Sequence, residues 1–327
     1  MKAIVLTEPR RLRVVDDWPE PTCGPTEVVV QMAGIGLCGS DLSLVEGRTP
    51  VASMPWLIGH EGGGDIIEIG SDVVDQRLGE RVVIEPNICC FACNFCMAGL
   101  TSACRRRRIL GVKERGIAAE RVAVPAKFVH LVPTETTPAT LACIEPWVVT
   151  NSAIRRAGVV AGDSCLIIGA GSQGLLLCLS LLAMGVTPDV VEPNRGRLAL
   201  AEHLGGHPAP DGHQYRFVFE TSGAPSVFAK ALASVEPNGC LVVVGQSSAP
   251  VELTTRELVQ RLITIRGSVI YDHPADFTNA VAQLRNGIDL TRVLRRRLIP
   301  DELDGDLDFV RDVPGKVWID LTGWANR

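Results

Sequence analysis

The first part of the chain is a series of short β-type segments that glycine and proline separate from one another. Short apolar segments bounded by such residues are typical of antiparallel strands. We therefore expect an antiparallel, barrel-like domain over residues 1–150. Its clearest strands are residues 4–6, 28–32, 64–69, 81–85 and 119–124.

Near Gly162 the pattern changes, and apolar strands begin to alternate with segments of helical periodicity. This alternation indicates a doubly wound parallel sheet, which we expect over residues 151–274. The run 204–213 contains too many glycines and prolines for a full strand and helix, so one βα unit should be abbreviated. The expected strands are 165–168, 189–192, 217–220 and 241–244, and the expected helices are 174–184, 195–203 and 226–235.

The last segment, residues 275–327, is expected to return to the first domain. It contains a predicted helix over residues 275–286 and a predicted closing strand over residues 316–321. The pattern thus predicts an α/β protein in which a barrel-like domain and a parallel-sheet domain follow one another.

Composition agrees with two folded domains and with no general affinity for nucleic acid. The chain has 327 residues, 46% of them hydrophobic, and a formal net charge of −5. This length exceeds that of one compact core, and the net negative charge gives no attraction for nucleic acid or an anionic membrane. Arginine runs at 105–108 and 295–297 are interpreted as surface or subunit-interface charge, because no stacking platform of aromatic residues accompanies them.

The N-terminus lacks the features of a secretory signal, because residues 8–11 interrupt its short apolar run. The most apolar window, 166–186, has glycines and polar residues near its start, which favour a buried strand, turn and helix over a membrane span. Eleven cysteines without an export signal favour a reducing cytoplasm, where closely spaced thiols bind metal more often than they form disulfides. We therefore expect a cytoplasmic protein.

Four closely spaced cysteines predict a structural metal site, which we call the four-cysteine lobe. Cys90, Cys93, Cys96 and Cys104 form the pattern C-x2-C-x2-C-x7-C. Two-residue gaps allow successive thiolates to converge on one tetrahedral Zn²⁺ at ~2.3 Å, and four thiolates leave no open position. An iron–sulfur cluster is the alternative, although bacterial ferredoxin runs have a shorter last gap that ends in Cys-Pro. Cys89 is expected to take no part.

Three further residues have types and settings that suit a second metal ion. Cys38 ends an apolar run, and His60 lies in a glycine-rich segment beside Glu61. Glu145 precedes Pro146 within an apolar stretch, where an unpaired charge would be costly. Each residue alone is more often part of a core, but one ion bound by Cys38, His60 and a glutamate accounts for all three.

In their order along the chain, these motifs resemble those of the zinc-dependent medium-chain dehydrogenases, and the resemblance extends from Met1 to about Leu321. Glu145-Pro146 is similar to the polyol, sugar and threonine dehydrogenase branch, since simple alcohol dehydrogenases usually have a cysteine there. The matching features are Cys-Gly-Ser-Asp (38–41), Gly-His-Glu-x-x-Gly (59–64), Gly-Glu-Arg-Val (79–82), the four-cysteine lobe, Glu-Pro (145–146) and a glycine-rich turn.

The resemblance implies a GroES-like β-barrel as the catalytic domain and a Rossmann fold as the cofactor domain. It also implies one catalytic and one structural Zn²⁺ per chain. Cys38 and His60 would hold the catalytic ion, with Glu61 or Glu145 as third protein ligand and an open position for water or substrate. Such an ion acts as a Lewis acid that lowers the pKa of a bound alcohol.

The same resemblance assigns roles to residues that follow Cys38. Ser40 is similar to the family's hydroxyl that takes the proton of the alcohol, and Asp41 to the group that orients His60. One position departs from the family, because many relatives have a histidine where this chain has Ser43. The usual proton relay is therefore expected to be rewired or slower, and no catalytic histidine is assigned.

The glycine-rich turn Gly169-Ala170-Gly171-Ser172-Gln173-Gly174 predicts a dinucleotide site, because it follows an apolar strand and begins a helix. Glu192 ends the next strand, eighteen residues beyond Gly174. A carboxylate there accepts hydrogen bonds from ribose hydroxyls and repels a 2′-phosphate, which favours NAD over NADP. Arg195 and Arg197 lie close enough to weaken that preference, and Arg197 is a candidate cofactor contact.

Two aspects of the substrate site and assembly stay open. Trp56 and Trp147 lie near His60 and Glu145 in sequence, and either a wall of the substrate cleft or core packing explains them. Residues 267–270 are similar to the segment by which relatives extend a sheet across a dimer, so a homodimer or homotetramer is expected.

We therefore expect a zinc-dependent oxidoreductase that transfers hydride between NAD(H) and a secondary alcohol or ketone of a polyol, sugar, cyclitol or related small alcohol. Zinc-free quinone or enoyl reductases share the fold but lack Cys38, His60 and the four-cysteine lobe as a set. The alternative outside enzymes is a zinc-bearing nucleotide- or nucleic-acid-binding protein without dehydrogenase activity, for which Ser43 and the arginine runs are the best support.

Overall fold

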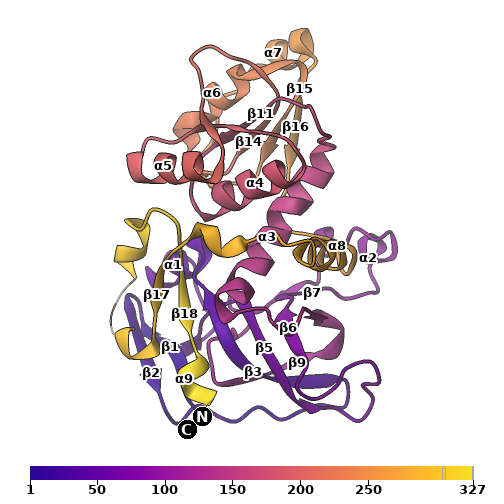
Figure 1. Cartoon of the computed structure of the whole chain (residues 1–327), viewed down its shortest axis with the longest axis vertical. Helices are drawn as coiled ribbons and strands as arrows, with labels where there is room; N and C mark the ends of the chain where they lie inside the picture. The colour runs from indigo at the N-terminus through magenta and orange to yellow at the C-terminus, as the bar shows by residue number, and fades with distance from the viewer. Residues whose placement is uncertain (304, 306, 326–327) are drawn as a thin grey trace. The chain divides into compact units, whose positions relative to one another are not determined.

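The computed structural model describes every residue except 304, 306, 326 and 327, which belong to the predicted C-terminal segment. The chain divides into two compact units (Figure 1). The first unit consists of Met1–Glu145 together with Asp272–Arg327, and the second of Pro146–Tyr271. The C-terminal segment therefore folds with the N-terminal part of the chain.

The described residues of the first unit form two mainly antiparallel sheets, a further two-stranded sheet of β7 and β8, and several short helices. Its strands are β1 (Ala3–Glu8), β2 (Arg11–Val15), β3 (Glu27–Gly36), β4 (Trp56–Leu57), β5 (Glu61–Ile69), β6 (Arg81–Ile84), β7 (Asn87–Ile88), β8 (Arg108–Ile109), β9 (Arg121–Pro125), β10 (Val129–Leu131), β17 (Leu294–Leu298) and β18 (Lys316–Asp320). Its helices are α1 (Gly39–Val45), α2 (Asn94–Met97), α8 (Ala275–Leu284) and α9 (Thr322–Ala325).

Strand β3 is the centre of the larger sheet of the first unit. The strand order is β10-β6-β5-β3-β18-β17, with β9 also paired to β3, and the smaller sheet has the order β2-β1-β4. The predicted closing strand is confirmed, because β18 pairs antiparallel with β3 through Trp318 and Gly36. The end of β3 is thereby brought together with the starts of β18 and β5.

One long helix, α3 (Pro138–Ala157), lies where the sequence predicts only an apolar stretch. The side-chain oxygen of Thr137 accepts a hydrogen bond from the Thr140 N–H at 3.1 Å, and Pro138 needs no donor at the first helical position. The first turn lies close to β3, since a Cβ added at Gly34 would be 2.3 Å from the Pro138 carbonyl oxygen. Pro146 and the continuous burial of residues 141–150 hide the helical period in the sequence.

The second unit is built on a parallel sheet with the order β13-β12-β11-β14-β15-β16. Numbered within the unit this is 3-2-1-4-5-6, a doubly wound order. β13 has two residues, and no helix of the described residues joins it to β14, which confirms the abbreviated βα unit. The elements are β11 (Cys165–Ile168), α4 (Ser172–Ala183), β12 (Asp189–Val191), α5 (Arg195–Leu204), β13 (His207–Pro208), β14 (Tyr215–Glu220), α6 (Phe228–Ala233), β15 (Val235–Val243), α7 (Thr255–Arg261) and β16 (Thr264–Gly267).

Both tryptophans considered for the substrate cleft are buried in hydrogen-bonded positions. The Trp56 indole N–H donates to the Gly111 carbonyl oxygen at 3.3 Å, and that of Trp147 donates to the Ser180 hydroxyl at 2.9 Å. Core packing therefore explains both residues. Among the described residues, no helix combines the length and apolar character that crossing a bilayer requires.

Candidate active site and metal centres

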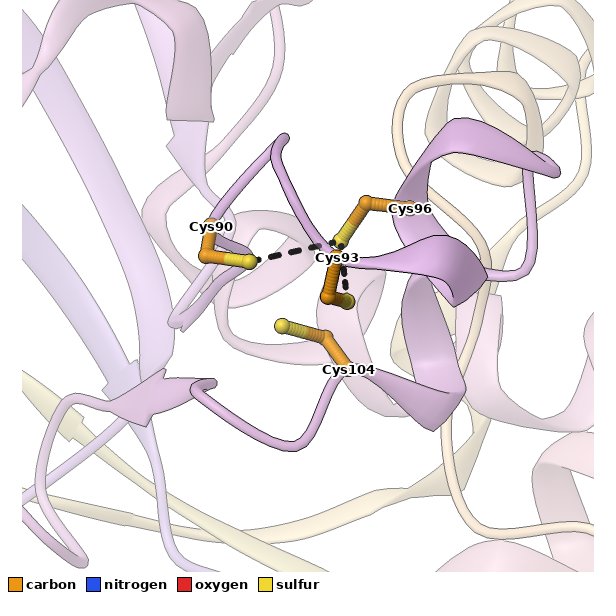
Figure 2. A group of neighbouring side chains, drawn as sticks. All are labelled: Cys90, Cys93, Cys96 and Cys104. Carbon is orange, nitrogen blue, oxygen red and sulfur yellow. Dashed lines mark hydrogen bonds between the residues drawn. The ribbon is translucent and has the colours of Figure 1, made fainter.

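The four-cysteine lobe brings its thiols together around α2. Cys93 precedes the first turn of this short helix, Cys96 lies within it, and Cys90 and Cys104 approach from the flanking loops (Figure 2). The four sulfurs all lie within 4.8 Å of one another, and Cys89 is outside the group. Two separations are 3.9 Å (Cys90 to Cys96) and 3.5 Å (Cys93 to Cys96).

These separations fit a tetrahedral zinc ion. Bonds of ~2.3 Å in that geometry place the sulfurs ~3.8 Å apart. Without metal the thiols differ in acidity: the backbone N–H of Ala92 lowers the pKa of Cys90 to about 6, whereas burial and the adjacent thiols raise that of Cys96 to about 12. Metal binding would therefore displace protons from the lobe. The affinity for metal should decrease as the pH is lowered.

A second group forms where β3 ends and β5 begins. Cys38 lies between β3 and α1, His60 immediately precedes β5, and Glu61 is the first residue of β5. One ligand atom from each of these three residues lies within 4.8 Å of the other two. We call Cys38, His60 and Glu61 the open group, because it has one sulfur, one nitrogen and one carboxylate oxygen and lacks a fourth protein ligand among the described residues.

Asp41 contacts two members of the open group from the first turn of α1. Its Oδ2 accepts a hydrogen bond from the Cys38 backbone N–H at 2.9 Å, and its Oδ1 lies 3.3 Å from the His60 Nδ1. The carboxylate is 1% exposed, so water does not screen it. Burial alone would lower the pKa of His60, but Asp41 together with Cys38 outweighs burial and raises that pKa well above its ordinary value. A metal ion on Nε2 would have to displace this proton.

A buried lysine that sequence analysis missed completes the surroundings of the open group. The ammonium group of Lys316, at the start of β18, pairs with Glu61 Oε2 and donates to the Leu37 carbonyl oxygen at 3.2 Å. Lys316 is fully buried, and Glu61 is 1% exposed. Burial lowers the pKa of Lys316, but Glu61 together with the thiols of Cys143 and Cys38 outweighs it, and the net pKa is raised to about 12. The Lys316 side chain is therefore charged at neutral pH.

Gly36 provides the space for this ion pair. A Cβ at this position of β3 would lie 2.5 Å from Glu61 Oε2, 2.7 Å from Lys316 Cε and 2.4 Å from the Ala142 carbonyl oxygen. Any larger residue would displace the carboxylate or the lysine. The other carboxylate proposed as a ligand, Glu145, is buried in α3 but does not belong to the compact group with Cys38 and His60.

The hydroxyl expected to act as a proton acceptor lies beside the open group. The distance from Ser40 Oγ to His60 Nε2 is 3.2 Å. Ser43 lies one turn further along α1, and its backbone carbonyl accepts from the N–H groups of Arg48 and Thr49. No histidine follows Cys38 in α1.

The glycine-rich turn of the second unit joins β11 to α4. Gly169 has a φ of +99°, which favours glycine, and a Cβ on Gly174 would lie 1.9 Å from the Gly169 carbonyl oxygen. A Cβ on Gly171 would meet nothing within 4 Å, so this glycine leaves open space at the N-terminus of α4. The Thr221 hydroxyl donates to the Gly169 carbonyl oxygen at 2.8 Å and steadies the turn. Thr221 follows β14 and was not found from the sequence.

Glu192 lies against this turn, directly after β12. Its Oε2 accepts from the Ala170 backbone N–H at 2.7 Å, and its Oε1 accepts from the Asn194 N–H at 2.9 Å. Asn194 caps α5 through the Arg197 N–H. Arg195 is exposed and Arg197 half-buried at the start of the same helix. Ser172 and Gln173 form the first turn of α4.

The arginine runs have partners within the first unit. Arg297 pairs with Asp320 at 2.8 Å, Arg108 pairs with Glu114 at 3.4 Å, and the Arg296 guanidinium lies 4.4 Å from the centre of the Phe309 ring. These contacts agree with the interpretation of both runs as local surface charge.

Two family models match the chain, one in the N-terminal part and one in the part that contains the parallel sheet. The model described as the alcohol dehydrogenase GroES-like domain matches residues 24–134, and the one described as zinc-binding dehydrogenase matches residues 174–286. Together they cover the open group, the four-cysteine lobe and the last glycine of the glycine-rich turn.

Dehydrogenases are also found among the relatives and solved structures that match most of the chain. The L-threonine 3-dehydrogenase of Thermococcus kodakarensis is 30% identical, with 79% of each chain covered. The D-altritol 5-dehydrogenase of Agrobacterium fabrum is 30% identical over 79% of this chain and 82% of the relative. The crystal structure of galactitol-1-phosphate dehydrogenase from Escherichia coli matches with a TM-score of 0.89 and 27% identity, covering 98% of this chain and 100% of the other.

Proposed function

This chain belongs to the zinc-binding medium-chain alcohol dehydrogenases, in the branch that contains polyol and threonine dehydrogenases, and from that premise we propose its substrate class, cofactor and residue roles. It is an NAD(P)-dependent alcohol dehydrogenase with a GroES-like domain and a Rossmann-like parallel sheet. The alternative of a zinc-bearing binding protein without activity has no support from the families. We propose that the substrate is a polyol, sugar, cyclitol or related small alcohol with a secondary hydroxyl, or the corresponding ketone.

The observation that carries this proposal is the open group. Cys38, His60 and Glu61 would hold one zinc ion, and the four-cysteine lobe would hold another. An ion in the open group supplies Lewis acidity that lowers the pKa of the substrate hydroxyl. Glu61 is favoured as the third ligand because its carboxylate lies with Cys38 and His60, and Glu145 is the alternative.

Three residues of the chain would prepare the hydroxyl for hydride loss. Ser40 would accept the hydroxyl proton at Oγ, which the 3.2 Å separation from His60 Nε2 supports. Asp41 would keep Cys38 and His60 oriented through its two carboxylate oxygens. Lys316 would hold Glu61 in place and offset one negative charge of the open group. Because Ser43 is not a base near neutral pH, the proton would leave Ser40 without a histidine.

NAD is proposed as the preferred cofactor. The carboxylate of Glu192 lies at the glycine-rich turn, where it would accept hydrogen bonds from the ribose hydroxyls and repel a 2′-phosphate. Arg197 would contact the cofactor from the start of α5. The open space at Gly171 supports a pyrophosphate at the N-terminus of α4.

A homodimer or homotetramer is proposed for the assembly. β16 (Thr264–Gly267) is an edge strand of its sheet, and Val269, just beyond it, is 45% exposed. An edge strand with free backbone groups is suited to continue a sheet into a second copy. A cytoplasmic location is proposed from the reduced state expected for the cysteines.

The test combines metal content with turnover on a substrate panel. Zinc-loaded protein is incubated with NAD or NADP and with polyols, sugar alcohols, sugar-alcohol phosphates, threonine and primary alcohols, and reduced cofactor is measured by absorbance. We expect reduction of NAD with at least one secondary alcohol and slower reaction of primary alcohols. Binding of NAD without reduction on any member of the panel would contradict the proposed substrate class.

A further inference from the structure

A third group of metal-ligand side chains lies in the first unit, apart from both cysteine-containing groups. Glu85, His130 and His273 each offer one ligand atom, and these atoms all lie within 4.8 Å of one another. We propose that these three residues form a binding site for a divalent first-row metal ion, with Zn²⁺ as the physiological ion. The proposal does not depend on the dehydrogenase activity.

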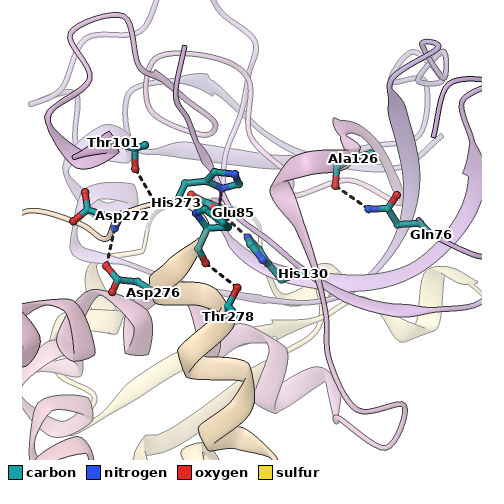
Figure 3. A network of polar contacts seen from close by, with 10 residues as sticks. Gln76, Glu85, Thr101, Ala126, His130, Asp272, His273, Asp276 and Thr278 are labelled. Atoms are coloured by element: carbon teal, nitrogen blue, oxygen red, sulfur yellow. Dashed lines mark hydrogen bonds and ion pairs between the residues drawn. The ribbon is translucent and has the colours of Figure 1, made fainter. Parts of the chain in front are cut away.

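Three segments that are distant in sequence converge on this group. Glu85 follows β6, His130 lies in the neighbouring strand β10, and His273 precedes α8 (Figure 3). The backbone N–H of Glu85 donates to the Phe128 carbonyl oxygen at 2.8 Å, so the ladder of β6 and β10 fixes two of the three ligands. The third ligand arrives from the returning C-terminal segment.

The ligand atoms already face one another. His130 Nε2 lies 2.7 Å and His273 Nδ1 lies 2.8 Å from the same oxygen, Oε2 of Glu85 (Figure 3). Glu85 is 1% exposed, whereas the side chains of His130 and His273 keep 11% and 8% of their surface accessible. A buried carboxylate is thus presented between two imidazoles that reach the surface.

Aromatic packing holds both imidazole rings in this orientation. The His130 ring stacks on Phe277 of α8 with ring centres 4.4 Å apart and an interplanar angle of 8°. The His273 ring packs against Phe128 at 4.7 Å and meets Phe91 edge-on at 5.3 Å. Ligands held by packing lose less conformational entropy when an ion binds.

Two imidazoles and one carboxylate are a donor set that suits zinc. Zn²⁺ binds histidine nitrogen and carboxylate oxygen at ~2.0–2.2 Å, and three such ligands with an open fourth position form a known type of site. In tetrahedral geometry these bonds separate the ligand atoms by ~3.3 Å. The observed separations of 2.7 and 2.8 Å are those of hydrogen bonds, so binding requires the imidazoles to move outward by about half an ångström.

A cavity beside the two histidines offers room for a fourth ligand of the ion. A cavity of about 700 Å³ is lined by His130 and His273 together with Cys89, Phe91, Lys127 and Phe128. Water or a small anion entering this cavity would complete the coordination. The cavity thus reaches two of the three residues of the group, His130 and His273.

The position of the site implies a structural role. The backbone N–H of His273 donates to the Thr101 hydroxyl at 2.7 Å, and Asp272 Oδ1 accepts from the Ser102 N–H at 2.9 Å. Thr101 and Ser102 both lie in the four-cysteine lobe, between Cys96 and Cys104. An ion on Glu85, His130 and His273 would therefore fasten the start of α8 and the lobe to the larger sheet.

The test compares metal content between the wild-type chain and H130Q/H273Q. Glutamine keeps a donor for Glu85 but is a poor zinc ligand, and His213→Gln, in an exposed loop of the second unit, is the matched control. All three proteins are equilibrated with the same buffered Zn²⁺, filtered free of excess metal and analysed by mass spectrometry for zinc per protomer. We expect wild type and H213Q to hold one zinc ion more than H130Q/H273Q, and affinity for that ion to fall at least ~100-fold in the double variant.

Equal zinc content in the three proteins would overturn the proposal and leave a metal-free hydrogen-bonded cluster. Should H130Q/H273Q fail to fold, the wild-type protein alone decides the question through anomalous X-ray scattering from zinc-equilibrated crystals. A zinc peak bonded to His130 Nε2, His273 Nδ1 and Glu85 supports the site. Peaks at the cysteine-containing groups but none at Glu85 would refute it.

Discussion

The four-cysteine lobe and the open group both contain cysteine, yet they differ in how the chain builds them. The lobe takes all its candidate ligands from Cys90 to Cys104, on one short helix and its flanking loops. The open group takes its candidate ligands from the end of one strand and the start of another, beside the buried side chains of Asp41 and Lys316. A closed site needs only local spacing, whereas an open site needs charge compensation that the rest of the fold supplies.

The largest expected effect follows removal of a ligand of the open group. Cys38→Ala or His60→Ala should abolish zinc binding there, and turnover should fall to background because nothing then polarises the hydroxyl. NAD should still bind, since the glycine-rich turn belongs to the second unit. Calorimetric titration with NAD and steady-state rates test both halves of the prediction, and substantial turnover in either variant would contradict it.

Ser40→Ala should retain the metal and lose ~10²- to 10⁴-fold in turnover, the range for one proton-transfer group. Activity should recover in part at high pH, where the alcohol loses its proton more readily. Ser43→Ala, on the same helix, is the control and should have a smaller effect. A pH–rate profile on a substrate for which chemistry limits the rate gives the answer, and near-normal turnover of metal-loaded Ser40→Ala would exclude Ser40.

Lys316→Met should destabilise the first unit by roughly 3–5 kcal/mol, because it leaves the Glu61 carboxylate buried without its partner. The double variant with Glu61→Gln should recover part of this loss. Because the folded protein raises the pKa of Lys316 from 10.5 to about 12, the stability that the charged lysine contributes is fully present below pH 10.5 and is lost only as pH rises through about 12. Denaturant unfolding at pH ~6 and ~9 should therefore give the same difference, and a neutral effect of Lys316→Met would contradict the ion pair.

Glu192→Ala should shift cofactor preference toward NADP by ~10- to 100-fold, the range expected for losing hydrogen bonds to a charged group. Arg195 and Arg197 are available at α5 to receive the 2′-phosphate. Ratios of kcat/KM for NAD and NADP measure the shift, with Glu202→Ala on α5 as a control that should change nothing. A wild-type enzyme that already prefers NADP would show that the arginines outweigh Glu192.

The contrast between the two cysteine-containing groups also explains what the sequence revealed. The lobe was predictable because its spacing alone carries the geometry, and the abbreviated unit after α5 because glycine and proline mark it. The role of Lys316 was not predictable, because a lysine in a short apolar strand 255 residues from Glu61 has no local signal of burial. α3 was missed because Pro146 and the continuous burial of residues 141–150 conceal its period. Glu85, His130 and His273 were missed because their pairing depends on the return of the C-terminal segment.

The most direct test follows zinc release and turnover in the same samples. H130Q/H273Q protein is used, so that only the open group and the four-cysteine lobe contribute zinc. A chelator is added, and zinc released and turnover remaining are recorded over time. We predict two zinc ions per protomer, with turnover lost in step with the first ion released and restored by added Zn²⁺, because four thiolates enclose the second. Turnover that survives release of the first ion, or that disappears only with the second, would contradict the assignment of catalysis to Cys38, His60 and Glu61.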